Sequence, residues 1–180
     1  MVTSPLVTMV YGVDYGLRNL VTVVRGDGRL WGQISLRENP NPEELAYSLI
    51  SSLPAGSIVV VEKLWGLRKR IKVTSTYLPF MKFQAALNHY APMKRIKVVQ
   101  VNPAYTSQTC PRCQYLSPRN RFQTTFKCHR CGYVANADYV GALNIALRYL
   151  KEREREQLRK ERKRKSKKQL KERHIGEEAN

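Results

Sequence analysis

Three short runs rich in β-branched and aromatic residues open the chain and predict strands. They cover residues 6–13, 19–25 and 30–36. Asp27, followed by a glycine, lies between the second and third run and is a strong signal for a tight hairpin. We therefore expect three antiparallel strands at the start of a sheet.

The next segments predict a helix of about three turns and then a buried strand. Asn41 or Asn39 can cap the helix and Pro42 suits its first turn. Its apolar face consists of Leu45, Leu49 and Ile50. Residues 58–61 (IVVV) then form an uninterrupted β-branched run, which is typical of a strand buried on both faces, and the run stops at Glu62.

A second helix is expected behind Pro79, where large apolar residues recur at helical spacing: Phe80, Phe83, Leu87 and Tyr90. Residues 96–101 predict a fifth strand. A last helix should begin near Asp138, and its packing face would be Ala142, Ile145, Ala146 and Tyr149. This order of elements indicates an RNase H-like (RuvC) α/β fold, with a five-stranded mixed sheet in the order 3-2-1-4-5 and helices on its faces.

Two CxxC pairs, Cys110 with Cys113 and Cys128 with Cys131, lie 14 residues apart. With no signal sequence at the start of the chain, they are better interpreted as reduced thiolates than as disulfides. The spacing predicts a four-cysteine zinc ribbon, in which a closed tetrahedral site holds structure and does not catalyse. His129 is not needed as a ligand, and a thioredoxin-like redox pair is the weaker alternative.

The ribbon interrupts the α/β core and divides the chain into three parts. We expect the core in residues 1–101 and 138–150, and the ribbon insertion in residues 102–137. Residues 151–180 form a basic tail, either helical or disordered, because no core-facing apolar stripe continues past residue 150.

Three acidic residues fall where strands and helices are expected to begin or end. Asp14 lies in or just past the first strand, Glu62 ends the fourth and Asp138 opens the last helix. Carboxylates gathered in this way repel one another unless a divalent cation lies between them, and their hard oxygens suit Mg²⁺ or Mn²⁺. Two such ions, about 3.5–4 Å apart, support in-line phosphodiester hydrolysis. Taken singly, the three are ordinary as a turn residue, a strand-end carboxylate and a helix N-cap.

Basic residues outnumber acidic ones by 32 to 14, which gives a formal net charge of +18. Such a charge attracts polyanions, so nucleic acid is the expected partner, and a merely basic surface is the alternative. Candidate phosphate-binding residues are Arg68, Lys69, Arg70, Lys72, Arg112, Arg119 and Arg121. The ribbon also carries three aromatic residues that either stack on bases or have a purely structural role: Tyr115, Phe122 and Phe126. Residues 148–173 contain 14 Lys or Arg and 5 Glu. This composition indicates either a phosphate-binding arm or a solvated tail with no specific role.

No apolar run is long enough for a membrane span, and the N-terminus lacks a signal peptide. These features favour a cytoplasmic protein.

Four stretches resemble the TnpB (OrfB) family of insertion-sequence transposons, relatives of the type V CRISPR effector nucleases. They are residues 12–24 (GVDYGLRNLVTVV), 58–64 (IVVVEKL), 101–113 (VNPAYTSQTCPRC) and 126–146 (FKCHRCGYVANADYVGALNIA). The resemblance implies a RuvC-like active site made by Asp14, Glu62 and Asp138, DNA cleavage and, in full-length members, guidance by RNA.

The sequence departs from the family pattern at a few positions. Gln114 and Val140 replace the usual Gly and Asn, while Asn144 keeps a second expected Asn. Full-length relatives also carry a long recognition region ahead of the first catalytic strand, and this sequence begins just before that strand. A possible protein partner is therefore a second chain that supplies the N-terminal recognition region. The alternative is a second copy of this chain, in a homodimer like that of Holliday-junction resolvases.

Two functions of different classes follow. The first is a transposon-associated, metal-dependent endonuclease acting on DNA, including single-stranded or branched DNA, with RNA as the less expected substrate. The second is a non-catalytic nucleic-acid-binding protein or regulator derived from a TnpB-like transposase. The intact set of three acids favours the first, and the closed thiolate site argues against a zinc-dependent hydrolase.

Overall fold

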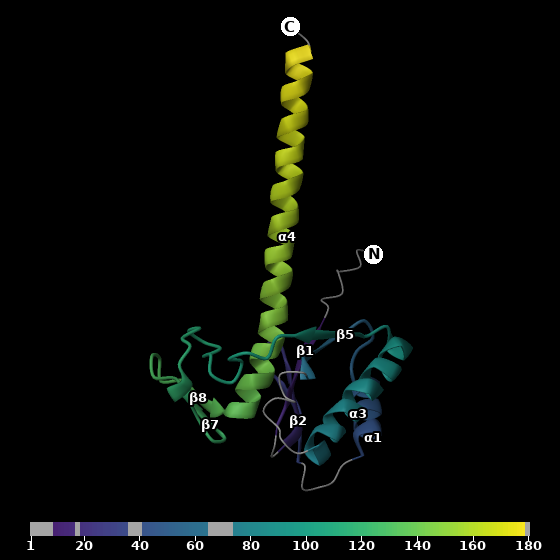
Figure 1. Cartoon of the computed structure of the whole chain (residues 1–180), viewed down its shortest axis with the longest axis vertical. Helices are drawn as coiled ribbons and strands as arrows, with labels where there is room; N and C mark the ends of the chain where they lie inside the picture. Colours follow the sequence, from purple (N-terminus) through teal and green to yellow (C-terminus); the bar gives the residue numbers. More distant parts are fainter. Residues whose placement is uncertain (1–8, 17–18, 36–40, 65–73, 179–180) are drawn as a thin grey trace, which may run out of the picture. The chain divides into compact units, whose positions relative to one another are not determined.

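The computed structural model describes residues 9–16, 19–35, 41–64 and 74–178 (Figure 1). The chain divides into two compact units, Met1–Leu147 and Arg148–Asn180, and the helix α4 (Ala137–Glu178) contributes to both. In the described ranges, no helix combines the length and the hydrophobicity that a membrane-spanning helix needs.

A five-stranded mixed sheet forms the centre of the first unit. Its strands are β1 (Val10–Tyr15), β2 (Asn19–Arg25), β3 (Leu30–Ser35), β4 (Ile58–Glu62) and β5 (Lys97–Val101). Their order is β3-β2-β1-β4-β5. The β1–β2 and β2–β3 pairs are antiparallel, and the β1–β4 and β4–β5 pairs are parallel. The five strands and the order expected from the sequence are confirmed.

The turn between β2 and β3 has the predicted chemistry. Asp27 accepts a hydrogen bond from the Arg29 N–H at 3.1 Å and pairs with the Arg25 guanidinium. The hydrogen bond that the Arg25 guanidinium donates to Asp27 lowers the pKa of this carboxyl group to about 2. Gly28 has a φ of 93°, a backbone conformation that glycine adopts without strain. Asp27 is thus explained by its turn.

Helices α1 (Pro42–Ser52) and α3 (Thr74–Tyr90) cover one face of the sheet. The cap of α1 is Asn41, whose side chain accepts a hydrogen bond from the Glu43 N–H at 2.9 Å. The expected start of α3 behind Pro79 is wrong, because the helix begins at Thr74 and contains this proline. Pro79 is the sixth residue of the helix and removes one backbone hydrogen bond, a loss that burial of the following phenylalanines offsets.

The first turns of α4 pack on the opposite face of the sheet, and the close fit depends on a glycine. A Cβ atom built on Gly12 would lie 2.0 Å from the Ala142 carbonyl oxygen and 2.7 Å from the Ala146 nitrogen. Both are backbone atoms, so they cannot move aside as a side chain can. Val24 packs against Ala142 and Leu143 beside this contact.

The ribbon carries a small antiparallel sheet that the sequence did not predict. Its strands are β6 (Arg121–Phe122), β7 (Thr125–Lys127) and β8 (Val134–Asn136), in the order β6-β7-β8. The 3-10 helix η3 (Pro118–Asn120) precedes them, and η2 (Ala91–Lys94) links α3 to β5. These strands are two or three residues long, too short to leave an alternating pattern in the sequence.

Candidate active site and metal centre

Asp14 and Glu62 lie side by side at the ends of two neighbouring parallel strands. The register pairs Val13 of β1 with Val61 of β4, so the next residue of each strand is the carboxylate. Successive side chains of a strand point to opposite faces of the sheet. Because Val13 and Val61 belong to the core under α1 and α3, Asp14 and Glu62 face the α4 side.

The third carboxylate, Asp138, comes from α4 on that same side. A Cβ atom on Gly141 would lie 2.8 Å from an Asp14 carboxylate oxygen, so this carboxylate packs directly against the helix backbone. Asp138 is three residues before Gly141, about one helical turn away. Asp14, Glu62 and Asp138 are 8, 3 and 5% exposed, and burial of three carboxylates requires compensating contacts.

Two of those contacts are well defined. Glu62 accepts a hydrogen bond from the backbone N–H of Tyr15 at 3.2 Å. The Arg121 guanidinium, from the ribbon, lies 3.4 Å from a carboxylate oxygen of Asp138. Burial and the negative charge of Glu62 raise the pKa of the Tyr15 phenol well above its usual value, so this phenol stays neutral.

The helix N-cap interpretation of Asp138 is wrong. Asn136 caps α4, because its side-chain oxygen accepts hydrogen bonds from the N–H groups of Asp138 and Tyr139 at 2.9 and 3.1 Å. Asp138 lies in the first turn, where the helix dipole favours a negative charge. Its side chain does not cap the helix and contacts the Arg121 guanidinium.

The three carboxylates share one face of the sheet without forming a tight ligand cluster. Within the described ranges, only the four cysteines form a group of three or more His, Cys, Asp or Glu side chains whose ligand atoms lie within 4.8 Å of one another. The geometry thus places the three acids on the same side of the sheet, with their ligand oxygens not all within 4.8 Å of one another.

The four cysteine sulfur atoms form a compact cluster, in which all lie within 4.8 Å of one another. The Sγ atoms of Cys110 and Cys131 lie 3.6 Å apart, and those of Cys113 and Cys128 lie 3.5 Å apart. These distances are too long for disulfides. They are close to the sulfur–sulfur separation of about 3.8 Å expected when four sulfur atoms surround a zinc ion tetrahedrally with Zn–S bonds of about 2.3 Å. The cluster can bind a structural metal such as zinc.

The backbone prepares this cluster for a cation. Burial acts to raise the pKa of Cys128, but hydrogen bonds from the N–H groups of Cys131 and Arg130 and from neighbouring thiols lower it to about 6. Burial raises the pKa of Cys110 to about 12. Metal binding must displace the Cys110 proton at neutral pH, so the affinity should fall as the pH is lowered.

Asn120 joins the two halves of the ribbon, and the sequence analysis missed it. Its amide donates to the carbonyl oxygens of Gln108 and Tyr115 at 2.9 and 3.1 Å, beside the first cysteine pair. Its carbonyl oxygen accepts from the His129 N–H, within the second pair, at 3.1 Å. The side chain is 1% exposed. A lone asparagine leaves no signal in the sequence that separates this role from a surface position.

Asn120→Ala is expected to destabilise the ribbon by about 1–2 kcal/mol, because it removes three part-buried hydrogen bonds that the Asn120 side chain makes with the backbone of both halves. Chelator competition should show weaker metal retention than in the wild type. Asn88→Ala, an exposed change on α3, is the matched control and should retain metal normally. Equal retention in both variants would show that Asn120 does not hold the two halves together.

Asn144 ties the ribbon to α4. Its amide donates to the carbonyl oxygens of Thr106 and Thr109 at 2.6 and 2.7 Å, just before the first cysteine. At the other end of the ribbon, the Ala137 N–H donates to the Thr124 carbonyl oxygen at 2.7 Å. The ribbon is thus anchored to the helix that carries Asp138.

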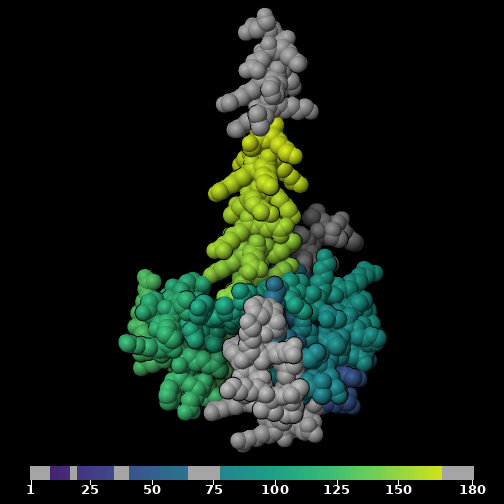
Figure 2. All heavy atoms as spheres, viewed as in Figure 1, coloured from purple at the N-terminus to yellow at the C-terminus, as the bar shows by residue number. Residues whose placement is uncertain are grey.

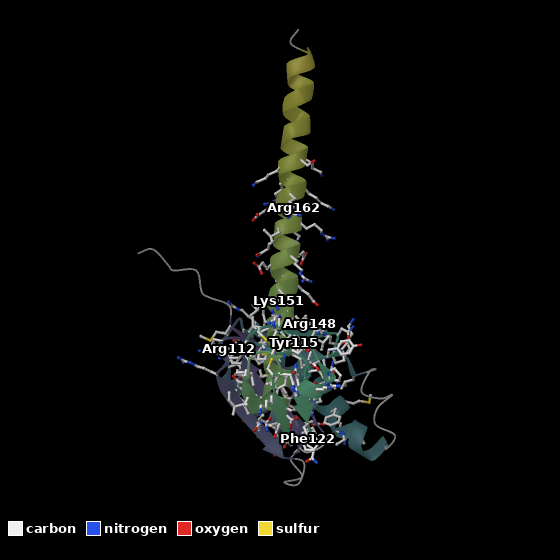
Figure 3. All side chains as sticks on the ribbon, turned by 90° about the vertical axis from the view of Figure 1, so that its left-hand side faces the viewer. Arg112, Tyr115, Phe122, Arg148, Lys151 and Arg162 are labelled. Atoms are coloured by element: carbon white, nitrogen blue, oxygen red, sulfur yellow. The ribbon has the colours of Figure 1, made fainter. Side chains whose placement is uncertain are left out.

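The candidate nucleic-acid residues have different surroundings. Arg112, which is labelled in Figure 3, is exposed, and so is Arg119. Arg121 is exposed as well and also contacts Asp138. The base-stacking alternative is wrong for Phe126, which is fully buried in the ribbon core, whereas Phe122 is 75% exposed and Tyr115 is partly exposed. The remaining candidates, Arg68, Lys69, Arg70 and Lys72, lie outside the described residues.

Comparison with known proteins finds relatives of parts of this chain. The family model described as the Cas12f1-like TNB domain matches residues 80–145, which include the four cysteines and Asp138. A CRISPR-associated endodeoxyribonuclease Cas12f1 of Sulfoacidibacillus thermotolerans is 44% identical over 69 residues, covering 38% of this chain and 16% of that protein. A putative RNA-guided DNA endonuclease, InsQ, of Escherichia coli is 52% identical over 50 residues, covering 27% and 12%.

The chain is a relative of the TnpB family and of the type V effectors. A TnpB-like protein of Aquifex aeolicus is 32% identical over 102 residues, covering 52% of this chain and 33% of that protein. The cryo-EM structure of a Cas12f1–sgRNA–target DNA complex matches with a TM-score of 0.58 and 17% identity, over 81% of this chain and 51% of that one. This likeness shows a shared fold, and the matches to TnpB relatives span a third or less of their length.

Proposed function

We propose that the chain is a divalent-metal-dependent endonuclease that hydrolyses DNA phosphodiester bonds on an RNase H-like (RuvC-like) sheet. Asp14, Glu62 and Asp138 would be its catalytic carboxylates. The observation that carries the proposal is the placement of Asp14 beside Glu62 at the ends of β1 and β4, facing α4, where Gly141 leaves room for the Asp14 carboxylate. The names of relatives, an endodeoxyribonuclease and a putative RNA-guided DNA endonuclease, support it.

The carboxylates fit a hard divalent cation. Oxygen donors from three separate elements suit Mg²⁺ or Mn²⁺, and a low exposure strengthens their attraction for the cation. Bound there as a pair, such ions would activate an attacking water and stabilise the leaving oxygen of an in-line displacement.

The chain's own residues hold the site in place. The buried strands fix Asp14 and Glu62, and the Tyr15 N–H orients the Glu62 carboxylate. Arg121 supplies a guanidinium beside Asp138, where it can exchange this contact for an oxygen of the DNA phosphate. Zinc on the four cysteines would keep Arg121 and α4 in register by holding the ribbon folded.

The substrate and partners belong to the same proposal. The substrate class is DNA, including single-stranded or branched DNA, and the relatives' names and complexes favour a guide RNA as a further partner. A transposon-associated role follows from the TnpB relatives.

The proposal is tested by incubating the zinc-loaded chain with labelled single-stranded, duplex and branched DNA and Mg²⁺ or Mn²⁺. Asp14→Asn is expected to slow cleavage at least about a thousandfold, because it removes a charged ligand at the reacting centre. Asp27→Asn changes the exposed turn carboxylate and should leave cleavage unchanged. Cleavage that persists in Asp14→Asn would contradict the proposal.

One contact favours the non-catalytic alternative. The ion pair of Arg121 with Asp138 already gives one of the acids a structural partner, as a binding protein would need. In that case wild type and Asp14→Asn would bind DNA equally and neither would cut it, even with guide RNA present.

A further inference from the structure

The second unit presents an unusual distribution of charge along one helix. In residues 148–158 of α4, four basic residues face three acidic ones. In residues 159–167 (RKERKRKSK), seven basic residues accompany a single Glu161. Every side chain in this second stretch is exposed (Figure 2). We call residues 159–167 the basic segment.

The two stretches differ in how they stabilise a helix. In the first, Glu156 pairs with Lys160 at 2.8 Å and with Arg153 at 3.9 Å, the spacing that supports an isolated helix. In the basic segment, like charges recur four residues apart, as in Arg159 with Lys163 and Lys163 with Lys167. Such pairs destabilise a helix unless counter-charges lie beside it.

The basic side chains of the segment surround the helix. At 100° per residue, Arg159, Lys163 and Lys167 share one side, while Arg164, Lys165 and Arg162 fall on the others. Side chains along this helix project to both sides of it in Figure 3. A flat acidic surface would neutralise the positive charge on only one side of the helix. Positive charge on all sides therefore favours a ligand that places negative charge on two opposite sides of the helix.

We propose that the basic segment binds duplex DNA by lying in the major groove and contacting the phosphates of both strands without reading sequence. The groove of B-DNA is about 12 Å wide and admits an α-helix of 10–12 Å diameter, whereas the major groove of duplex RNA is too narrow. The phosphates supply the missing counter-charges, so the segment becomes a more stable helix on binding. The choice of DNA as the ligand rests on the proposed function. Duplex binding by the basic segment does not require cleavage.

The test compares two variants of the full, zinc-loaded chain that lose the same charge. One is Arg162→Gln with Lys163→Gln and Lys165→Gln, since glutamine keeps the helix propensity. The control is Arg29→Gln with Lys82→Gln and Lys97→Gln, all exposed in the first unit. Fluorescence anisotropy with labelled duplex DNA, without added divalent metal, measures affinity across a series of salt concentrations. Amide hydrogen exchange of residues 159–167 is followed with and without the duplex.

The segment variant should bind duplex DNA about tenfold or more weakly, with the slope of log affinity against log salt reduced by about 2–3, because counterion release scales with phosphate contacts. The control should lose much less, and exchange in the segment should slow on binding. Equal losses in both variants would overturn the proposal. So would an equal segment-dependent loss with duplex RNA. A chain that binds in this way and cuts nothing would refute the nuclease alone.

Discussion

Cys128→Ser is expected to abolish metal retention and to unfold the ribbon. Cys128 is 1% exposed, and hydrogen bonds from neighbouring N–H groups and thiols lower its pKa to about 6, so its thiolate can bind metal at neutral pH. A structural zinc site is worth about 10–16 kcal/mol in small zinc domains, far more than the short strands β6, β7 and β8 can replace. Released zinc should fall from one equivalent to none, and limited proteolysis should cut within the ribbon.

Phe122→Ser is the control for this prediction, because it introduces the same residue into the ribbon at a side chain that is 75% exposed. It should keep one equivalent of zinc and resist proteolysis as the wild type does. A Cys128→Ser chain with a full equivalent of zinc, or with a protected ribbon, would show that the cluster is not a metal centre.

Gly12→Ala is expected to destabilise the first unit by more than about 4 kcal/mol. The new Cβ would lie 2.0 Å from the Ala142 carbonyl oxygen, so the first turns of α4 must leave the sheet. Asp138 would move with them. Denaturant unfolding should show the loss of stability, and any metal-dependent cleavage should be lost with it.

Gly32→Ala is the matched change on β3, where a Cβ atom meets nothing within 4 Å. This variant should unfold within about 1 kcal/mol of the wild type. A Gly12→Ala chain as stable as Gly32→Ala would mean that α4 does not pack on β1 as described.

Local chemistry made much of the fold predictable. The β-branched run of β4 indicated a central strand, the turn at Asp27 indicated the β2–β3 hairpin, and Asn41 with Pro42 indicated the start of α1. These signals come from neighbouring residues, so no knowledge of the tertiary structure was needed. The spacing of the cysteines likewise predicted that their four sulfur atoms would meet.

The errors and omissions concern features that tertiary packing decides. Pro79 marked a helix boundary by propensity, but burial of the phenylalanines behind it kept the helix intact. The sequence allowed Asp138 as the N-cap of the last helix, but in the structure Asn136 occupies that position. The close approaches at Gly12 and Gly141 join segments more than 120 residues apart, so no local pattern reports them.

The most direct test of the account is the binding of Mn²⁺, measured by electron paramagnetic resonance on the zinc-loaded chain. This measurement does not depend on which DNA the chain cuts. We expect Asp14→Asn, Glu62→Gln and Asp138→Asn each to weaken Mn²⁺ binding at least about tenfold, because each removes one negative oxygen ligand. Asp27→Asn should bind as the wild type does. If the three variants bind Mn²⁺ as tightly as the wild type, the carboxylates do not form one metal site and the proposed active site is wrong.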